Sequence, residues 1–160
     1  MGPEKAVADG YIKIQDYIKV KKSLDAYKIA TLEPVESDTV RGLWIYGPPG
    51  IGKSRFARDN HTDIYLKAQN KWFDGYNGQK TILLDDHDHA ILGHYLKIWC
   101  DHYSCTGETK GGTVPLCHER FVVTSNYSIE QLYEKDGPEM VAAIRRRCKQ
   151  IHMTEPFKKK

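Results

Sequence analysis

The stretch that decides the fold is Gly47–Ser54, "GPPGIGKS", which follows the apolar run "GLWIY" at 42–46. It matches the pattern GxxxxGK[S/T], in which glycines let the backbone wrap closely around a phosphate group. In this pattern Lys53 reaches the β- and γ-phosphates, and the Ser54 hydroxyl helps to hold Mg²⁺. The residues expected to contact the nucleotide are Gly47, Pro48, Pro49, Gly50, Ile51, Gly52, Lys53, Ser54 and Arg55.

Short apolar runs alternate with segments of helical spacing along most of the chain. Strands are expected at 42–46, 63–67, 79–86 and 119–126, and helices between and after them. This alternation predicts an α/β fold, a P-loop NTPase core with a central, mostly parallel sheet. A lysine-rich helical segment precedes this core. It is equally consistent with a helix packed on the main domain and with a segment for contacts between subunits.

The predicted organisation has four parts. They are a flexible leader at 1–9, a helical collar and linker at 10–39, the ATPase domain at 40–155 and a basic tail at 156–160.

Composition narrows the function classes only a little. The chain of 160 residues has a formal net charge of +3, which weakly favours a polyanionic partner. No apolar run approaches the ~18 residues of a membrane span, and the start lacks the apolar core of a secretory signal. The four cysteines are therefore expected to be reduced, intracellular thiols. A zinc site of Cys100, His102, Cys105 and Cys117 lacks CxxC spacing, so ordinary packing thiols are favoured.

Two acidic residues, Asp85 and Asp86, follow the apolar run "TILL". Ligands of open α/β sheets lie at the carboxyl ends of the strands, where this pair is expected. We assign Asp85 to the magnesium ion and Asp86 to orienting or deprotonating the attacking water. For Asp88, capping of the helix that follows is the better interpretation.

A polar residue also ends the apolar run "FVVTS". Asn126 stands there, and its amide can hydrogen-bond both the γ-phosphate and the attacking water. Asparagine is common in turns, so this assignment depends on the phosphate loop and the acidic pair.

Two basic features bear on what the nucleotide drives. "GETKGGTVP" at 107–115 has hairpin chemistry and places Lys110 on a glycine-rich turn, together with Gly111 and Gly112. Such a projecting lysine suits a grip on the phosphate backbone of a nucleic acid. Arg145, Arg146 and Arg147 end a predicted helix, and one of them is explained by the helix dipole. One or two of them could contact the γ-phosphate of a nucleotide bound to a neighbouring subunit and stabilise its charge during transfer.

Other functions remain open at this point. A small-molecule or nucleoside kinase would use the same loop, with the arginines as a phosphate-clamping lid. A nucleotide-gated assembly module without turnover is disfavoured by Asp85 and Asp86. A GTPase is rejected, because the segment from Lys71 to Asp74 has one residue too many for NKxD and precedes the acidic strand.

The aromatic residues Trp72, Phe73 and Tyr76 allow two interpretations. They could stack bases. Packing of a hairpin against the sheet is favoured over stacking, because such residues are more often buried.

Five stretches occur together in one order: "GPPGIGKS", "NKWFDGYNGQ", "ILLDD", "KGGTVP" and "VVTSN". In order and spacing they resemble the helicase domain of circovirus-like replication-initiator (Rep) proteins, which are superfamily 3 helicases. The resemblance covers roughly 40–153, and its most specific parts are "KWFDGY" and "KGGTVP".

The resemblance implies an AAA+ core, a homo-hexameric ring and ATP- and Mg²⁺-dependent movement along single-stranded DNA. It makes Lys53 and Ser54 Walker A, Asp85 and Asp86 Walker B, and Asn126 the sensor. Lys110 would lie on the DNA-contacting hairpin, Arg145 or Arg146 would be the arginine finger, and the early helices would be the oligomerisation collar. The expected site of action is the host nucleus.

The chain also departs from that family. Initiators of this kind carry a nicking domain with a metal-binding HxH or HxQ and a catalytic tyrosine. "HDH" at 87–89 lacks the surrounding pattern. We therefore expect an excised helicase domain, with nicking left to a part of the full-length protein outside this sequence.

Overall fold

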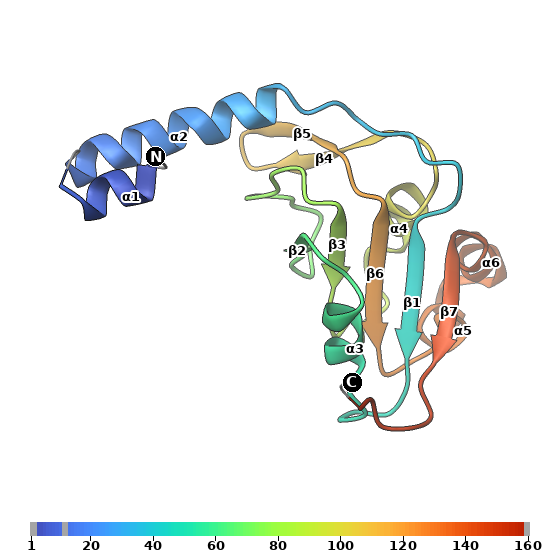
Figure 1. Ribbon diagram of the computed structural model, residues 1–160. Coiled ribbons are helices and arrows are strands. Elements are labelled where there is room, and N and C mark those ends of the chain that lie inside the picture. Colours follow the sequence, from blue (N-terminus) through green and yellow to red (C-terminus); the bar gives the residue numbers. More distant parts are fainter. Residues whose placement is uncertain (1–2, 11–12, 159–160) are drawn as a thin grey trace. The chain divides into compact units, whose positions relative to one another are not determined.

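The computed structural model describes residues 3–10 and 13–158 and divides the chain into two units (Figure 1). The first extends to Leu32 and the second begins at Glu33. The boundary therefore falls inside the stretch at 10–39 that the sequence assigns to collar and linker.

The first unit consists of the helices α1 (Pro3–Ala8) and α2 (Ile14–Ala30). Helix α1 lies within the stretch expected to be a flexible leader. Helix α2 contains no buried residue. Five of its large apolar side chains are exposed: Ile14, Ile18, Val20, Leu24 and Tyr27.

The second unit is built on a parallel sheet of five strands in the order β2-β3-β6-β1-β7. The strands are β1 (Gly42–Tyr46), β2 (Ile64–Leu66), β3 (Thr81–Leu84), β6 (Arg120–Ser125) and β7 (Cys148–His152). This confirms the predicted α/β fold with a mostly parallel sheet. Strand β7 was not predicted, because "CKQIH" carries one strongly apolar residue and directly follows an arginine-rich helix.

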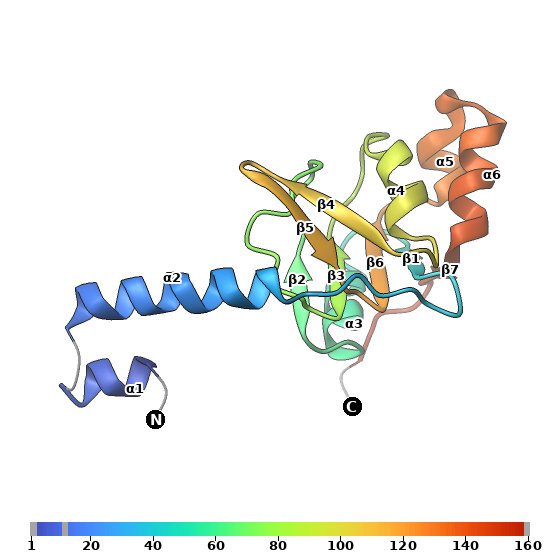
Figure 2. The ribbon, with the colours of Figure 1, turned by 90° about the horizontal axis from the view of Figure 1, so that it is seen from above.

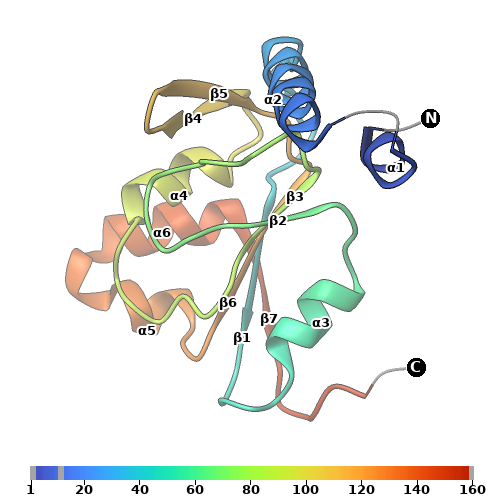
Figure 3. The same cartoon turned by 90° about the vertical axis from the view of Figure 1, so that its left-hand side faces the viewer.

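Helices cover both faces of the sheet, as Figure 3 shows. Helix α3 (Lys53–Asp59) lies on one face, and α4 (Gly93–Trp99), α5 (Ile129–Tyr133) and α6 (Pro138–Arg147) lie on the other. A 3₁₀ turn at Glu134–Asp136 and Gly137 separates α5 from α6, at the predicted break. Because both faces are covered, all four residues of β3 are buried, which explains the unbroken apolar run "TILL".

The segment before β1 is fastened to the sheet domain by a buried arginine. Arg41 is fully buried, and its guanidinium donates hydrogen bonds to the carbonyl oxygens of Val35, Asp101 and Tyr103. The backbone N–H of Ser37 also donates to the carbonyl of His102 at 2.8 Å. The residues from Val35 onward therefore run along the loop after α4.

A separate antiparallel hairpin connects α4 to β6. Its strands are β4 (Cys105–Thr109) and β5 (Gly112–Leu116), and Lys110 and Gly111 form its tip. Figures 1 and 2 show it beside the amino ends of the sheet strands, away from the phosphate loop. A side chain at Gly107 would place its Cβ 2.6 Å from the Phe73 ring, so only glycine allows this close packing. The hairpin predicted from the glycine-rich turn is present.

A buried histidine makes the stability of this unit depend on pH. His118 is 1% exposed, and Nε2 lies 2.7 Å from the carbonyl oxygen of Trp99. Burial lowers the pKa of His118 from 6.5 to about 4. The unfolded chain therefore binds a proton between these two values that the folded chain does not. The free energy of unfolding should fall as the pH falls through this window, by at most about 3 kcal/mol from this group.

Replacing His118→Gln keeps a donor near the Trp99 carbonyl but removes the titration. Denaturation in urea at several pH values from 7 to 4 should show a shallower loss of stability for the variant than for the wild type. Equal slopes in the two proteins would contradict the assignment. His87, also fully buried with a pKa of about 4, contributes with the same sign in both proteins.

Candidate nucleotide-binding site

The phosphate loop lies between the carboxyl end of β1 and the start of α3 (Figure 1). Gly50 and Gly52 have φ values of 79° and 98°, in the left-handed region that glycine adopts without a steric penalty. The chain can therefore reverse tightly before Lys53, where the helix begins. Ile51 is 8% exposed and packs into the core under α3, so only its backbone can face a ligand.

Lys53 is held across the loop by three oxygen atoms. Its Nζ donates to the carbonyls of Gly47 at 2.9 Å and Pro48 at 3.0 Å, and to Oδ1 of Asn126 at 3.0 Å. The side chain is 6% exposed. A buried ammonium group whose partners are all neutral oxygens is placed to donate to phosphate oxygens in their stead.

Asp85 stands at the carboxyl end of β3, opposite Ser54. The Ser54 hydroxyl lies 2.6 and 2.7 Å from the two carboxylate oxygens. Burial alone would raise the pKa of Asp85, but hydrogen bonds from Ser54 and Thr124, with Arg58 at 3.4 Å, outweigh it and lower the pKa. The carboxylate therefore stays ionised at neutral pH.

Asp86 is exposed and turned by an unusual backbone conformation. Its φ of 53° lies in the left-handed region, which aspartate tolerates better than most residues. Its backbone N–H donates to the Thr124 hydroxyl at 2.9 Å, and the same hydroxyl donates to Asp85. Thr124 thus fixes both members of the acidic pair, a role that the sequence analysis missed.

Asp88 orients the sensor residue. It accepts hydrogen bonds from the backbone N–H of Asn126 at 2.7 Å and from its side-chain Nδ2 at 3.2 Å. The other end of the amide, Oδ1, is thereby left to face Lys53. The predicted capping role of Asp88 is wrong: α4 begins at Gly93, and the residue before it, Leu92, makes no side-chain cap.

Several of these groups line one cavity of about 340 Å³ at the carboxyl ends of the strands. It joins the phosphate loop, one member of the acidic pair, Asp86, and the sensor Asn126. Its lining residues are Pro49, Gly50, Gly52, Lys53, Ser54, Arg55, Asp86 and Asn126.

The chain returns to the phosphate loop after β7. The backbone N–H of Phe157 donates to the carbonyl of Ile51 at 3.0 Å, and its ring contacts Phe56 edge to face at 5.6 Å. The Phe157 Cβ lies 3.0 Å from where a Cβ at Gly52 would stand. This backing of the loop was not predicted, because Phe157 falls in a stretch read as a basic tail.

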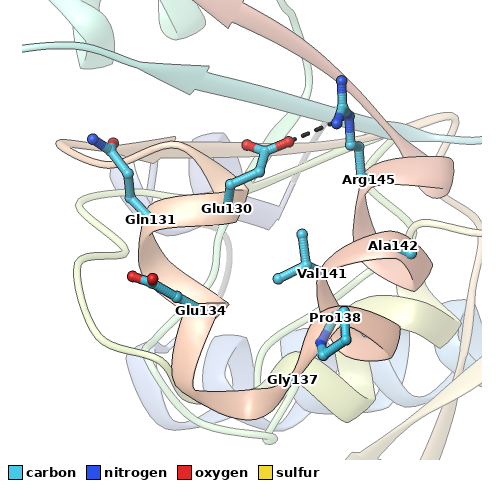
Figure 4. A pocket seen from close by; sticks show the side chains of 8 residues that line it. All are labelled: Glu130, Gln131, Glu134, Gly137, Pro138, Val141, Ala142 and Arg145. Atoms are coloured by element: carbon cyan, nitrogen blue, oxygen red, sulfur yellow. Dashed lines mark ion pairs between the residues drawn. The ribbon is translucent and has the colours of Figure 1, made fainter.

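The arginine cluster lies away from the cavity. Arg147 forms an ion pair with Asp101 at 2.8 Å and donates to the carbonyl of Ala143. Arg146 is exposed, and Arg145 pairs with Glu130 at 3.2 Å across a groove between α5 and α6 (Figure 4). This groove has a volume of about 660 Å³.

The hairpin tip also lies apart from the cavity. Lys110, Gly111 and Gly112 are exposed, and the backbone N–H of Lys110 donates to Asp74 Oδ1 at 2.9 Å. Phe73 and Tyr76 are 0% and 1% exposed, so both pack rather than offer a stacking face.

In the described ranges, 3–10 and 13–158, no three His, Cys, Asp or Glu residues gather in a way that could hold a metal ion. The four cysteines are free. None of the described helices is long and apolar enough to cross a membrane.

The chain is similar in sequence to a family of helicases and to several viral replication-associated proteins. A family model described as RNA helicase matches residues 43–106, from β1 into the hairpin. The replication-associated protein of Porcine circovirus 1 is 42% identical over 106 residues, which cover 64% of this chain and 34% of that protein. Those of Porcine circovirus 2 and of Beak and feather disease virus are 39% and 37% identical and cover 64% and 58% of this chain, and 34% and 32% of their own lengths.

The matches confirm the resemblance to circovirus-like replication-associated proteins that carry a helicase domain. The chain spans about a third of the length of these curated relatives. A crystal structure of a primosome component from Streptococcus pyogenes has a TM-score of 0.45 and 16% identity, and covers 86% of this chain and 79% of that one. The assignment of the fold rests on the strand order and not on this match.

Proposed function

We propose that the chain is the ATP-hydrolysing helicase domain of a viral rolling-circle replication initiator, and that it moves along single-stranded DNA as a homo-oligomeric ring, in the expected case a hexamer. The observation that carries this proposal is the cavity shared by Lys53, Ser54, Asp86 and Asn126, with Asp85 hydrogen-bonded to Ser54.

ATP binding begins with exchange of hydrogen-bond partners at Lys53. The ammonium group gives up one or more of its oxygen partners and donates instead to the β- and γ-phosphates. Asn126 Oδ1 is released in the same exchange, because it is one of those partners at 3.0 Å. Binding or loss of the phosphates therefore changes the hydrogen bonding of Asn126, which directly follows β6.

The oxygen pair of Ser54 and Asp85 fits a magnesium ion. The two side chains are already within hydrogen-bond distance, and Asp85 is ionised. Mg²⁺ prefers oxygen ligands and keeps several waters, so one hydroxyl and one carboxylate are enough beside the phosphates. When bound there, the ion neutralises charge on the β- and γ-phosphates.

Asp86 and Asn126 act on the attacking water. The Asp86 carboxylate lines the cavity and accepts the proton of the water as its oxygen bonds to the γ-phosphorus and the bond to ADP breaks. Asn126 holds that water in line, with its amide oriented by Asp88. Asp88 is therefore a positioning residue.

The cavity contains Arg55 but neither Arg145 nor Arg146. Those two are exposed, so a neighbouring subunit can use either as a cationic partner for the γ-phosphate. The exposed apolar side chains of α2 also support self-association, because such side chains gain stability when another surface covers them.

The hairpin supports the choice of single-stranded DNA as the partner. Lys110 is exposed on the two-residue tip between Thr109 and Gly112 and offers a charge to backbone phosphates. A small-molecule kinase has no use for such a tip. Action in the host nucleus, and a nicking domain elsewhere in the full-length protein, remain predictions.

Two substitutions test the nucleotide site. Lys53→Ala should lower ATP hydrolysis at least ~10²-fold, because it removes the cation that holds the phosphates. Asp86→Asn should also abolish turnover while ATP binding stays within a few-fold of wild type. Steady-state phosphate release and binding of a fluorescent ATP analogue measure the two effects. Lys80→Ala, an exposed lysine outside the cavity, is the matched control. Turnover retained in Lys53→Ala would refute the assignment.

Asp88 offers a test that the sequence alone did not suggest. Asp88→Ala should lower the hydrolysis rate about tenfold, because the Asn126 amide loses its orientation, while ATP affinity changes less than threefold. The exposed neighbour His89→Ala should behave as wild type. A rate unchanged in Asp88→Ala would show that the contact has no part in hydrolysis.

A further inference from the structure

Residues 67–80 connect β2 to β3. A connection between parallel strands must run from the carboxyl end of one strand back to the amino end of the next, and it usually contains a helix. Here the described residues 67–80 contain no helix and cross as an irregular chain, drawn in green in Figure 1. Such a chain must have its backbone groups satisfied by specific partners.

At the carboxyl edge, this connection contacts the acidic pair. The Gln69 side chain donates from Nε2 to the backbone carbonyl of Asp85 at 2.7 Å. Its Oε1 lies 2.7 Å from Nδ1 of His87, which is fully buried. Both ends of the amide are used, so Gln69 is tied to the backbone immediately around Asp86.

At the other edge, the same connection contacts the hairpin. Asp74 Oδ1 accepts from the backbone N–H of Lys110 at 2.9 Å, and the Phe73 N–H donates to the carbonyl of Glu108 at 2.8 Å. The carbonyl of Asp74 is in turn held by the Tyr65 hydroxyl at 2.7 Å. The tip of the hairpin therefore rests on Asp74.

A buried lysine holds the stretch between these contacts together. Lys67 is 5% exposed, and its Nζ donates to the carbonyls of Ala68, Asn70 and Trp72. The same ammonium lies 4.5 Å from the centre of the Phe73 ring. One side chain thus ties the backbone of the loop together and attaches it to the core.

We propose that residues 67–74 couple the nucleotide site to the hairpin, with Gln69 and Asp74 as the positioning residues at the two ends. A shift of the Asp85–Asp86 backbone on binding or hydrolysis of ATP moves Gln69, and the stretch pinned by Lys67 carries that displacement to Asp74 and the Lys110 backbone. Neither residue touches nucleotide or DNA in this account. The inference rests on the proposed function, because it requires both ATP turnover and a hairpin that contacts DNA.

The test uses ATPase rates without DNA and at saturating single-stranded oligonucleotide. Asp74→Ala should keep the rate without DNA within twofold of wild type and lower the stimulation by saturating DNA roughly tenfold, within the usual range of coupling between sites. Asp74→Asn keeps Oδ1 as an acceptor for Lys110 and should restore most of the stimulation. A residue that only binds DNA behaves differently: Lys110→Ala should weaken DNA affinity.

Gln69→Leu tests the other end and remains informative if Asp74→Ala does not fold. It should also lower the ratio of stimulated to unstimulated rate. If both residues lie on one path, the double variant should be no worse than the poorer single variant, whereas independent effects would multiply.

Stimulation equal to wild type in Asp74→Ala, or multiplying losses in the double variant, would overturn the coupling role and leave the proposed function intact. No stimulation in the wild-type protein would instead overturn the proposed function.

Discussion

The ammonium group of Lys53 is the contact on which the rest of the site depends. It bridges two carbonyls of the phosphate loop and the Asn126 amide, which lie far apart in sequence. This bridge is possible because β1 and β6 are parallel neighbours, with Tyr46 opposite Ser125. The next residues along the two strands, Gly47 and Asn126, therefore leave the sheet side by side. With β3 on the far side of β6, the acidic pair reaches the same edge.

The two functional ends of the domain lie at opposite edges of this sheet. The proposed nucleotide site is at the carboxyl ends of the strands, whereas the hairpin stands beside their amino ends (Figure 1). Movement at the carboxyl ends of the strands can reach the hairpin only through segments that run the length of the strands. Strand β6 is one such segment, since it begins close after the hairpin and ends beside Asn126. The irregular crossover pinned by Lys67 is a second, and it contacts the hairpin tip rather than its base.

Local patterns in the sequence predicted what is local in the structure. The phosphate loop, the apolar strands and the hairpin each have a short signature, and each is present. Strand β7 was missed because a polar strand at the edge of a sheet needs few apolar residues. The partners of Asp88, Thr124 and Gln69 are residues distant in the chain, so no spacing rule could reveal them. Asp88 was misassigned for the same reason, because a carboxylate before a helix resembles a cap until the position of the helix start is known.

Full-rate hydrolysis is proposed to need a second copy of the chain, because the chain's own Arg145 and Arg146 stand outside its cavity. DNA is proposed to stimulate that hydrolysis further, through the hairpin. The most direct measurement is the ATPase rate per chain across a range of protein concentrations, with and without a single-stranded oligonucleotide. The account predicts a rate per chain that rises with concentration and rises further with DNA. A rate that is independent of concentration and indifferent to DNA would contradict it.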